Sequence, residues 1–203
     1  MTEEIAYTAR LEMRRKKGTT MIKIGIIIGS TRPGRVGEEV AKWAYALAKE
    51  RKDAEFELVD IKDYNLPLLD EPKPAATQEY SKEHTQKWSA KINELDGFIF
   101  VTPEYNHSTS AALKNALDFL YNEWTNKAAG FISYGSIGGA RAVEALRPIM
   151  AQFKIADVRE QVMLFLSDDF ENGIPKPKQR HEKGLSTLFD QVVAWSTAMK
   201  SLR

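Results

Sequence analysis

Cysteine is absent from this chain of 203 residues. Its absence excludes disulfide bonds, thiolate metal sites and thiol redox chemistry. The sequence also lacks an apolar run approaching the roughly 20 residues that span a bilayer. Neither sign of charge is in excess, because 29 basic residues face 28 acidic ones. We therefore expect a cytoplasmic protein that neither spans a membrane nor binds nucleic acid.

Two nucleotide-binding signatures are missing from the loop that follows the first apolar run. Gly29 and Gly34 have the spacing of a Walker motif, but Arg35 and Val36 stand where Lys and Ser or Thr are required. Without that hydroxyl to hold magnesium, phosphoryl transfer is disfavoured. The dinucleotide fingerprint G-x-G-x-x-G is absent too. Asp60 could act as a ribose-binding acid, although an ordinary charge at a strand end is the favoured interpretation.

The same stretch has a strand, loop and helix pattern that is typical of anion binding. Residues 24–28 are apolar, rich in Ile and too few for a helix, which predicts a buried strand. Small, hydroxyl and arginine residues fill positions 29–37, where a helical pattern begins. A helix N-terminus and arginine side chains both attract anions. We therefore predict that this loop holds a phosphate; a simple connection between strand and helix is the alternative.

Hydrophobic periodicity predicts one α/β domain over residues 21–203, preceded by a polar N-terminal extension over 1–20. The alternating elements indicate a doubly wound, three-layer sheet of five parallel strands. Ligands of such sheets bind beyond the carboxyl ends of the strands. The expected strands are 24–28, 55–60, 97–101, 128–134 and 156–165. The expected helices cover 37–51, 81–94, a segment capped by Ser110 and a segment after residue 139. A polar segment, 167–180, precedes a last helix at the end of the chain.

Two further loops would lie at that carboxyl edge. Residues 103–106 offer backbone amides, an Asn side chain and an aromatic ring, which suit a flat heteroaromatic ligand, but a turn selected for its Pro and Asn fits equally well. The glycines of 135–139 would let backbone approach a ligand closely, or would simply form a flexible connection.

Two rival sites are weaker. Ser136, Asp168 and His181 follow the chain order of an α/β-hydrolase triad, but Tyr134 replaces the first glycine of the nucleophile elbow. His107 could donate a proton or bind a metal. No third ligand is spaced near it, which favours a histidine of a turn.

Four separate motifs resemble the NADPH-dependent FMN reductase family, which has a flavodoxin-like fold and includes quinone and azo-dye reductases. The resemblance extends from Met21 to about residue 165 in the family's order and spacing, and Ser110 departs from the Pro that many members carry. The motifs are Gly29-Ser30-Thr31-Arg32, Pro103-Glu104-Tyr105-Asn106, Leu113-Lys114-Asn115-Ala116-Leu117-Asp118, and Tyr134-Gly135-Ser136 with Gly138-Gly139-Ala140-Arg141-Ala142.

The resemblance implies strand order 2-1-3-4-5, bound FMN, and hydride passed from NADPH (or NADH) through FMN to a small-molecule electron acceptor, whether quinone, flavin or azo compound. The cofactor carries this chemistry, so no protein residue is predicted to be catalytic, and no metal is implied. By resemblance, Ser30, Arg32, Arg35, Val36 and Gly37 would hold the FMN phosphate; Pro103, Glu104, Tyr105 and Asn106 would contact the flavin ring and ribityl chain; and Gly135, Ser136 and Gly138 would line the other side of the ring.

Members of the family are commonly dimers or tetramers, which implies a homodimer or homotetramer. Trp124 and the loop 64–80 are the candidates for its interface and for a cover over the flavin. Two other functions stay open. A flavodoxin-like electron carrier would need an acidic docking surface, which a net charge of +1 does not supply. A redox-sensing FMN-binding protein is the other possibility, and the sequence is silent on it.

Overall fold

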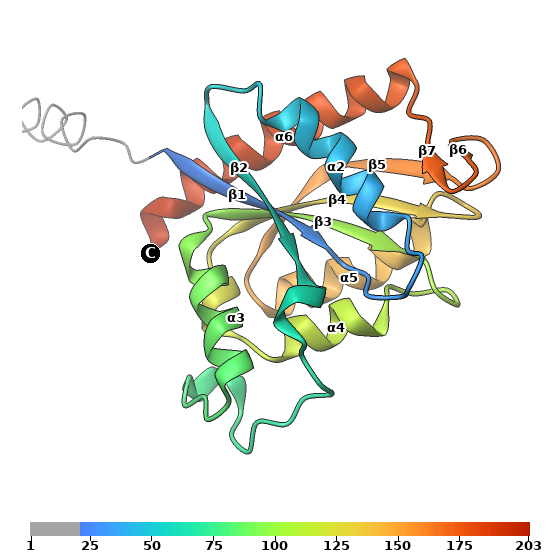
Figure 1. Ribbon diagram of the computed structural model, residues 1–203. Coiled ribbons are helices and arrows are strands. Elements are labelled where there is room, and N and C mark those ends of the chain that lie inside the picture. Colours follow the sequence, from blue (N-terminus) through green and yellow to red (C-terminus); the bar gives the residue numbers. More distant parts are fainter. Residues whose placement is uncertain (1–20) are drawn as a thin grey trace, which may run out of the picture.

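The computed structural model describes residues 21–203, which form a five-stranded parallel sheet flanked by helices (Figure 1). The strands are β1 (Ile22–Ile28), β2 (Ala54–Asp60), β3 (Gly97–Pro103), β4 (Ala128–Gly135) and β5 (Ala156–Phe165). The helices are α2 (Gly37–Ala48), α3 (Glu83–Glu94), α4 (Ala111–Asp118), α5 (Ala140–Gln152) and α6 (Gln179–Met199). Short 3-10 helices are η1 (Ile61–Tyr64), η2 (Ala75–Thr77), η3 (Asn122–Trp124) and η4 (Lys200–Leu202).

The strand order is β2-β1-β3-β4-β5, which confirms the predicted doubly wound, flavodoxin-like topology. The chain runs outward from β1 to β2 and then returns past β1 to β3, so the direction of winding reverses there. In register, Ile28 at the end of β1 lies beside Asp60 of β2 and Val101 of β3. A ligand is therefore expected above the ends of β1 and β3.

Helices cover both faces of the sheet. Helices α2 and α6 lie on one face, and α3, α4 and α5 lie on the other (Figure 1). Every residue of β3 and β4 is buried. This burial is the reason that these strands are apolar throughout instead of alternating.

The expected element boundaries hold to within a few residues, with two differences. Helix α2 ends at Ala48, not at residue 51: the Arg51 N–H closes a turn on the Ala48 carbonyl (3.0 Å), and the Arg51 guanidinium pairs with Asp53 and Asp190. The polar segment 167–180 contains a small hairpin, β6 (Phe170–Glu171) with β7 (Ile174–Pro175). Its turn is Asn172-Gly173, both with positive φ. Such a dipeptide favours a two-residue hairpin, so the signal was present in the sequence.

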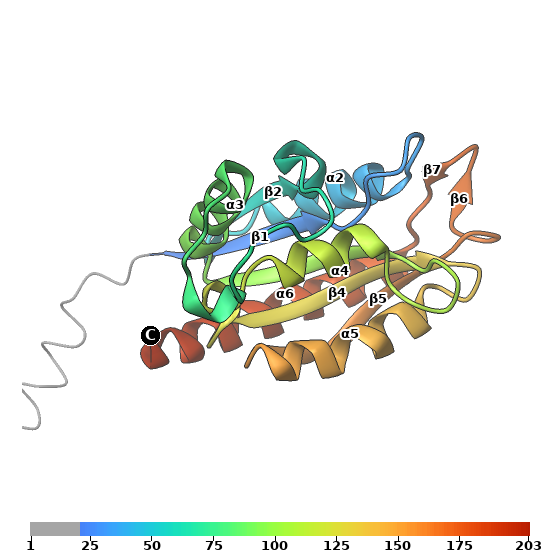
Figure 2. The same cartoon turned by 90° about the horizontal axis from the view of Figure 1, so that it is seen from below.

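Figure 2 shows the loops that follow β1, β3 and β4 at one end of the sheet, while the C-terminus lies at the opposite end. The predicted extension 1–20 lies outside the described residues. Among residues 21–203, no helix is long and apolar enough to cross a bilayer.

Candidate functional site

The loop after β1 ends in a helix N-terminus that no side chain caps. Val36 occupies the N-cap position of α2, and the first hydrogen bond into the helix runs from the Val40 N–H to the Val36 carbonyl (3.1 Å). The leading N–H groups of the helix are therefore free to meet an anion. Gly34 turns the loop with φ of +70°, a conformation that L side chains rarely adopt.

The two arginines of this loop differ in their partners. The Arg35 side chain is only 7% exposed, and its Nη1 donates to Asp60 Oδ1 at 2.8 Å. Nη2 pairs with the other Asp60 oxygen, and Nη1 also donates to the Ser30 carbonyl. Hydrogen bonds with Asp60 raise the pKa of Arg35 despite its burial. Arg35 therefore fastens the loop to the end of β2, and Asp60 acts as a strand-end charge that also caps η1 through the Lys62 N–H (3.0 Å).

Arg32 is exposed, and the structure gives it no ion pair with any residue of 21–203. Its guanidinium carbon lies 5.7 Å from the centroid of the Tyr105 ring, which belongs to the loop after β3. This cation–π contact brings the two loops together. Arg32 is thus the cation of the loop that is free to bind an anion.

A tightly packed floor lies under the loop. Ser30 is fully buried, and its Oγ is 3.4 Å from the Tyr134 hydroxyl. A Cβ at Gly37 would lie 2.5 Å from that hydroxyl and 2.9 Å from Ser30 Oγ, so only glycine fits. Burial raises the pKa of Tyr134 to about 12, which keeps the phenol neutral and able to donate. The floor holds the backbone of the loop in one position.

The loop after β3 is tied to the loop after β4. The Glu104 N–H donates to the Tyr134 carbonyl (2.9 Å), and the nearly buried Glu104 carboxylate accepts from the Arg141 N–H (3.2 Å) and pairs with its guanidinium. Glu104 thus satisfies an amide at the start of α5, a position where a negative charge is favoured. Its side chain is committed to that contact, so any contact of Glu104 with a ligand would come from its backbone.

The remaining residues of this loop form a tight turn. Tyr105 and Ser108 exchange backbone hydrogen bonds of 2.9 and 3.2 Å. Between them, Asn106 and His107 have positive φ and are exposed. Pro103 is buried at the end of β3, whereas the Tyr105 ring is half-buried and reaches toward the first loop. His107 is therefore a residue of the turn, and no group of three metal-binding side chains occurs within residues 21–203.

The glycine loop after β4 is held in a defined shape. The Gly138 N–H donates to the Gly135 carbonyl (3.1 Å), and Ser133 Oγ donates to the Gly138 carbonyl (2.7 Å). Gly138 and Gly139 have φ of +70° and +76°. Ser136, at the tip, is exposed. The loop therefore has a defined conformation, and its exposed residues are Ser136 and Ile137.

The rival hydrolase triad does not assemble. His181 begins α6, where its Nδ1 accepts from the Lys178 N–H (2.8 Å) and its Nε2 faces Asp169 at 3.3 Å. Within the described part of the chain, Ser136 makes no hydrogen bond to His181 or Asp168. Asp169 is buried and instead organises the β6–β7 region, accepting from the Phe165 N–H (2.9 Å) and from the Arg180 guanidinium (2.7 Å).

The β6–β7 hairpin borders the site, which the sequence had not indicated. The Phe170 ring lies 6.2 Å from the Tyr134 ring, and a Cβ at Gly173 would be 3.7 Å from Val36. The hairpin therefore packs beside the N-terminus of α2. Only the three-dimensional contact reveals this neighbour, because Gly173 lies 137 positions after Val36 in the sequence.

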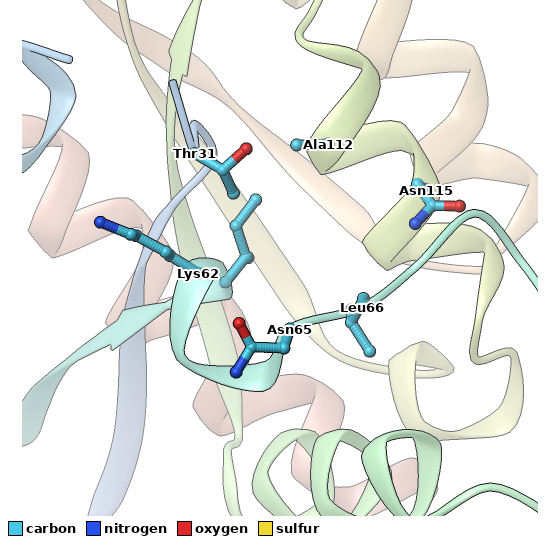
Figure 3. A pocket seen from close by; sticks show the side chains of 7 residues that line it. Thr31, Lys62, Asn65, Leu66, Ala112 and Asn115 are labelled. Atoms are coloured by element: carbon cyan, nitrogen blue, oxygen red, sulfur yellow. The ribbon is translucent and has the colours of Figure 1, made fainter. Parts of the chain in front are cut away.

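A hollow of about 320 Å³ opens on the β2 side of the first loop (Figure 3). Thr31, Lys62, Asn65 and Leu66 line it together with Asn115 of α4. The hollow adjoins the first loop but does not lie between the loops after β3 and β4. It belongs to the rim of the site.

The long segment 64–80, predicted as a cover, is fastened to helices. The Asn115 side chain donates to the Pro67 carbonyl (2.6 Å) and accepts from the Leu69 N–H (3.0 Å). Further along, the Tyr80 hydroxyl donates to the buried Glu123 (3.0 Å). Asn65 and Leu66 border the hollow beside Thr31, Leu68 and Leu69 are exposed, and Tyr80 packs against the core.

The prediction that Trp124 lies at a subunit interface is wrong. Trp124 is fully buried, and its Nε1 donates to the Leu117 carbonyl at 3.1 Å. Its ring packs 4.9 Å from Phe98 and 5.9 Å from Trp88, centroid to centroid. A surface contact requires exposure, and this indole forms part of the core beneath α3 and α4.

Comparisons with known proteins agree with this geometry. Residues 22–167 match the model of the family described as NADPH-dependent FMN reductase. An NAD(P)H-dependent FMN reductase from Nectria sp is 47% identical over 128 residues, which cover 60% of this chain and 64% of that protein, just under two thirds of its length. A 2-hydroxy-1,4-benzoquinone reductase from Burkholderia sp is 31% identical over 185 residues, covering 86% of this chain and 96% of that protein.

A solved structure shares the fold. The flavoenzyme NAD(P)H:(acceptor) oxidoreductase FerB from Paracoccus denitrificans superposes with a TM-score of 0.69 at 21% identity, covering 88% of this chain and 99% of that one. At this identity, the likeness supports the fold and no more. With the family model spanning most of the chain, however, the assignment is plain: this chain belongs to the NADPH-dependent FMN reductase family.

Proposed function

We propose that this chain is an FMN-dependent NAD(P)H oxidoreductase that reduces a quinone, a flavin or an azo compound. One observation carries the proposal. Three loops at the carboxyl edge of the sheet contact one another, and within residues 21–203 they offer an uncapped helix N-terminus, an arginine without a carboxylate partner and a glycine-rich loop. Flavin mononucleotide has a terminal phosphate and a flat ring, which this set of groups suits.

In the phosphate-binding part, the residues divide into two roles. Arg32 and the amides of Val36 and Gly37 would meet the phosphate directly, with Ser30 below them. Arg35 would position the loop through Asp60, because its guanidinium is already committed to that carboxylate. This division refines the resemblance, which had grouped both arginines as phosphate ligands.

In the ring-binding part, Pro103, Glu104, Tyr105 and Asn106 would contact one region of the flavin and ribityl chain, and Gly135, Ser136 and Gly138 the other side of the ring. When bound, FMN supplies the acceptance and donation of a hydride. The protein orients the flavin, and the N–H groups of the two loops can stabilise negative charge on it. NAD(P)H and a proton supply the two electrons and two protons that convert a quinone to a hydroquinone.

Absorbance of the purified protein tests this function. We expect flavin bands, or their appearance after FMN is added and excess removed. NADPH or NADH should bleach them without another protein, and a benzoquinone should restore them with turnover. A protein that stays colourless after FMN addition would refute the proposal. If NAD(P)H is not consumed, and dithionite instead reduces the flavin to a long-lived one-electron state, the protein is a carrier.

The proposal extends to assembly and location: a cytoplasmic homodimer or homotetramer. Leu68 and Leu69, beside the hollow at the rim of the site, are 84% and 49% exposed, and such side chains favour a subunit contact. Light scattering coupled to size-exclusion chromatography should give twice or four times the mass of the chain. Leu68→Lys should shift that mass toward the monomer, and Leu202→Lys, at the other end of the sheet, should not.

A further inference from the structure

Two side chains hold the glycine loop after β4 from below. Gln161 of β5 donates from Nε2 to Ser133 Oγ (3.0 Å), and Ser133 Oγ donates to the Gly138 carbonyl (2.7 Å). Ser133 is fully buried, and Gln161 is half-buried. We refer to the Gln161 amide, the Ser133 hydroxyl and the Gly138 carbonyl as the relay.

The edge strand β5 supports the loop on the face of the sheet that α5 covers. Phe131 packs with the residues of α5, and Ser133, two positions later in β4, lies on the same face. In register, Gln161 lies beside Phe131 and Met163 lies beside Ser133. A Cβ at Gly138 would be 2.9 Å from Met163 Cβ, so the loop rests directly on β5.

The direction of donation along the relay is fixed by its last member. The Gly138 carbonyl can only accept, so the Ser133 hydroxyl must donate its single proton to it. The same hydroxyl then has only lone pairs to offer, and the amide group of Gln161 must donate to it. A carboxylate at position 161 would reverse this direction, because it can only accept and would draw the Ser133 proton away from Gly138.

The relay determines which way the peptide between Gly138 and Gly139 faces. No cis peptide bond occurs in the described chain, so the Gly139 N–H points opposite to the Gly138 carbonyl. The carbonyl points back toward Ser133 in the sheet, and the N–H therefore points outward, beyond the carboxyl edge. Among residues 21–203, no group accepts from this N–H. A Cβ at Gly135 would lie 3.3 Å from the Gly139 nitrogen, which places this amide beside a residue expected to line the flavin ring.

We propose that the relay locks this peptide so that the Gly139 N–H donates to bound FMN, and that Gln161 is a positioning residue which favours the reduced flavin. This inference rests on the proposed function. The reduced ring carries more negative charge than the oxidised ring, so a fixed N–H beside it stabilises the reduced form preferentially. A peptide rotated by half a turn would present the Gly138 carbonyl oxygen and repel that charge. The relay thereby raises the reduction potential of bound FMN.

Ser133→Ala tests the relay, because it removes the hydroxyl without changing charge. The full chain is loaded with FMN, and the midpoint potential is measured by dye-linked titration. Reduced FMN should lose affinity at least about tenfold more than oxidised FMN, which lowers the potential by about 30 mV for a two-electron couple. Ser196→Ala is the matched control: Ser196 is equally buried, its Oγ has no hydrogen-bond partner within residues 21–203, and its loss should leave the potential unchanged.

Gln161→Glu examines the direction of the relay. In the native background, this variant should lower the potential by a similar amount, because the carboxylate takes the Ser133 proton from the Gly138 carbonyl. In the Ser133→Ala background, it should add little, because no hydroxyl proton remains. A direct effect of the new charge on the flavin would instead appear equally in both backgrounds.

The outcomes separate this inference from the proposed function. If Ser133→Ala binds FMN with an unchanged potential, the relay has no role, and an equal shift from Gln161→Glu in both backgrounds removes Gln161 from it. Either result leaves the proposed function standing, whereas a wild type that binds no FMN refutes both. Should Ser133→Ala fail to fold, Gln191→Glu decides, since Gln191 accepts from the Glu160 N–H (3.0 Å) and belongs to α6 on the opposite face. Equal shifts from Gln161→Glu and Gln191→Glu would overturn the inference.

Discussion

The two ends of the sheet use charge in opposite ways. At the carboxyl edge, Arg32 is exposed and pairs with no carboxylate of residues 21–203, and no side chain in that range caps the α2 N-terminus. At the amino edge, Lys200 and Arg203 enclose Asp96, so the charges there are matched to one another. The first arrangement is ready for a ligand, whereas the second mainly closes the fold. Lys127 is the exception at the amino edge, because it is buried and forms no ion pair with any carboxylate in the described part of the chain.

The same contrast in charge pairing distinguishes the two arginines of the first loop, Arg32 and Arg35. Arg35 is paired with a carboxylate, as Lys200 and Arg203 of the amino edge are, although it lies three residues from Arg32. A residue's position in a binding loop therefore does not establish that it binds. The partner that already holds its guanidinium decides the role.

The largest effect on FMN binding should come from Gly37→Ala. Its Cβ would lie 2.5 Å from the Tyr134 hydroxyl, so the loop must move. We expect FMN affinity, measured by fluorescence quenching, to fall about 100-fold, because phosphate binding depends on aligned amides. Adding Tyr134→Phe should recover part of the loss. Gly34→Asn is the matched control, since nothing lies within 4 Å of that position and Asn tolerates positive φ. Equal losses in both variants would contradict this explanation.

Breaking the ion pair between Arg35 and Asp60 should chiefly lower the free energy of unfolding. Arg35→Met leaves the Asp60 carboxylate without its partner, and we expect urea denaturation to show a loss of about 3 kcal/mol. Lys42→Met removes two exposed ion pairs, with Glu38 and Glu39, and should change the free energy of unfolding by less than about 0.5 kcal/mol. If Arg35→Met retains its stability but loses FMN, Arg35 is a ligand and not a positioning residue.

The matched charges of the amino edge should show a pH signature. Burial alone would raise the pKa of Asp96, but hydrogen bonds from Lys200 and the Lys23 N–H outweigh it and hold the pKa below its usual value. The stabilisation is therefore present above the pKa of the unfolded state, about 3.9, and is lost as pH falls through the lower folded value. Asp96→Asn should lower the free energy of unfolding by about 2 kcal/mol at pH 7 and by less at pH 2. A cost that does not change with pH would contradict the ion pairs.

The smallest predicted change is a gain in stability, whereas the preceding variants lose stability. Burial lowers the pKa of Lys127 to about 7, so the unfolded state binds more protons between about pH 7 and pH 10, and stability rises with pH in that window. Lys127→Met removes the desolvation cost but loses the bond to the Ile92 carbonyl. We expect a net gain of about 1 kcal/mol at pH 7 that shrinks by pH 10. Destabilisation at pH 7 would show that Lys127 is well solvated.

Local patterns predicted most of the architecture. The all-apolar stretches became β3 and β4, and Ser110 caps α4 as expected, its Oγ accepting from the Leu113 N–H (3.1 Å). These features depend on residues close in sequence, which periodicity and capping rules describe. The family motifs extended the prediction to strand order, which periodicity does not determine.

Features that depend on distant contacts were not accessible in the same way. The pairing of Arg35 with Asp60, the burial of Trp124 and the packing of the β6–β7 hairpin beside Val36 each join separated segments. The Asn172-Gly173 turn was a local signal, but nothing local indicates what the hairpin touches. Lys127 has no sequence signature at all, because its burial comes from α3, β3 and the C-terminal residues together.

The central claim is that the carboxyl edge recognises a terminal phosphate through Arg32 and the α2 amides. Binding of FMN and of riboflavin, which lacks the phosphate, to the wild type and to Arg32→Ala tests it most directly. The wild type should prefer FMN strongly. Loss of one charge-assisted hydrogen bond, about 1.5–3 kcal/mol, should narrow that preference by at least about tenfold in Arg32→Ala, with riboflavin affinity unchanged. If the two flavins lose affinity equally, or if neither does, Arg32 does not bind the phosphate.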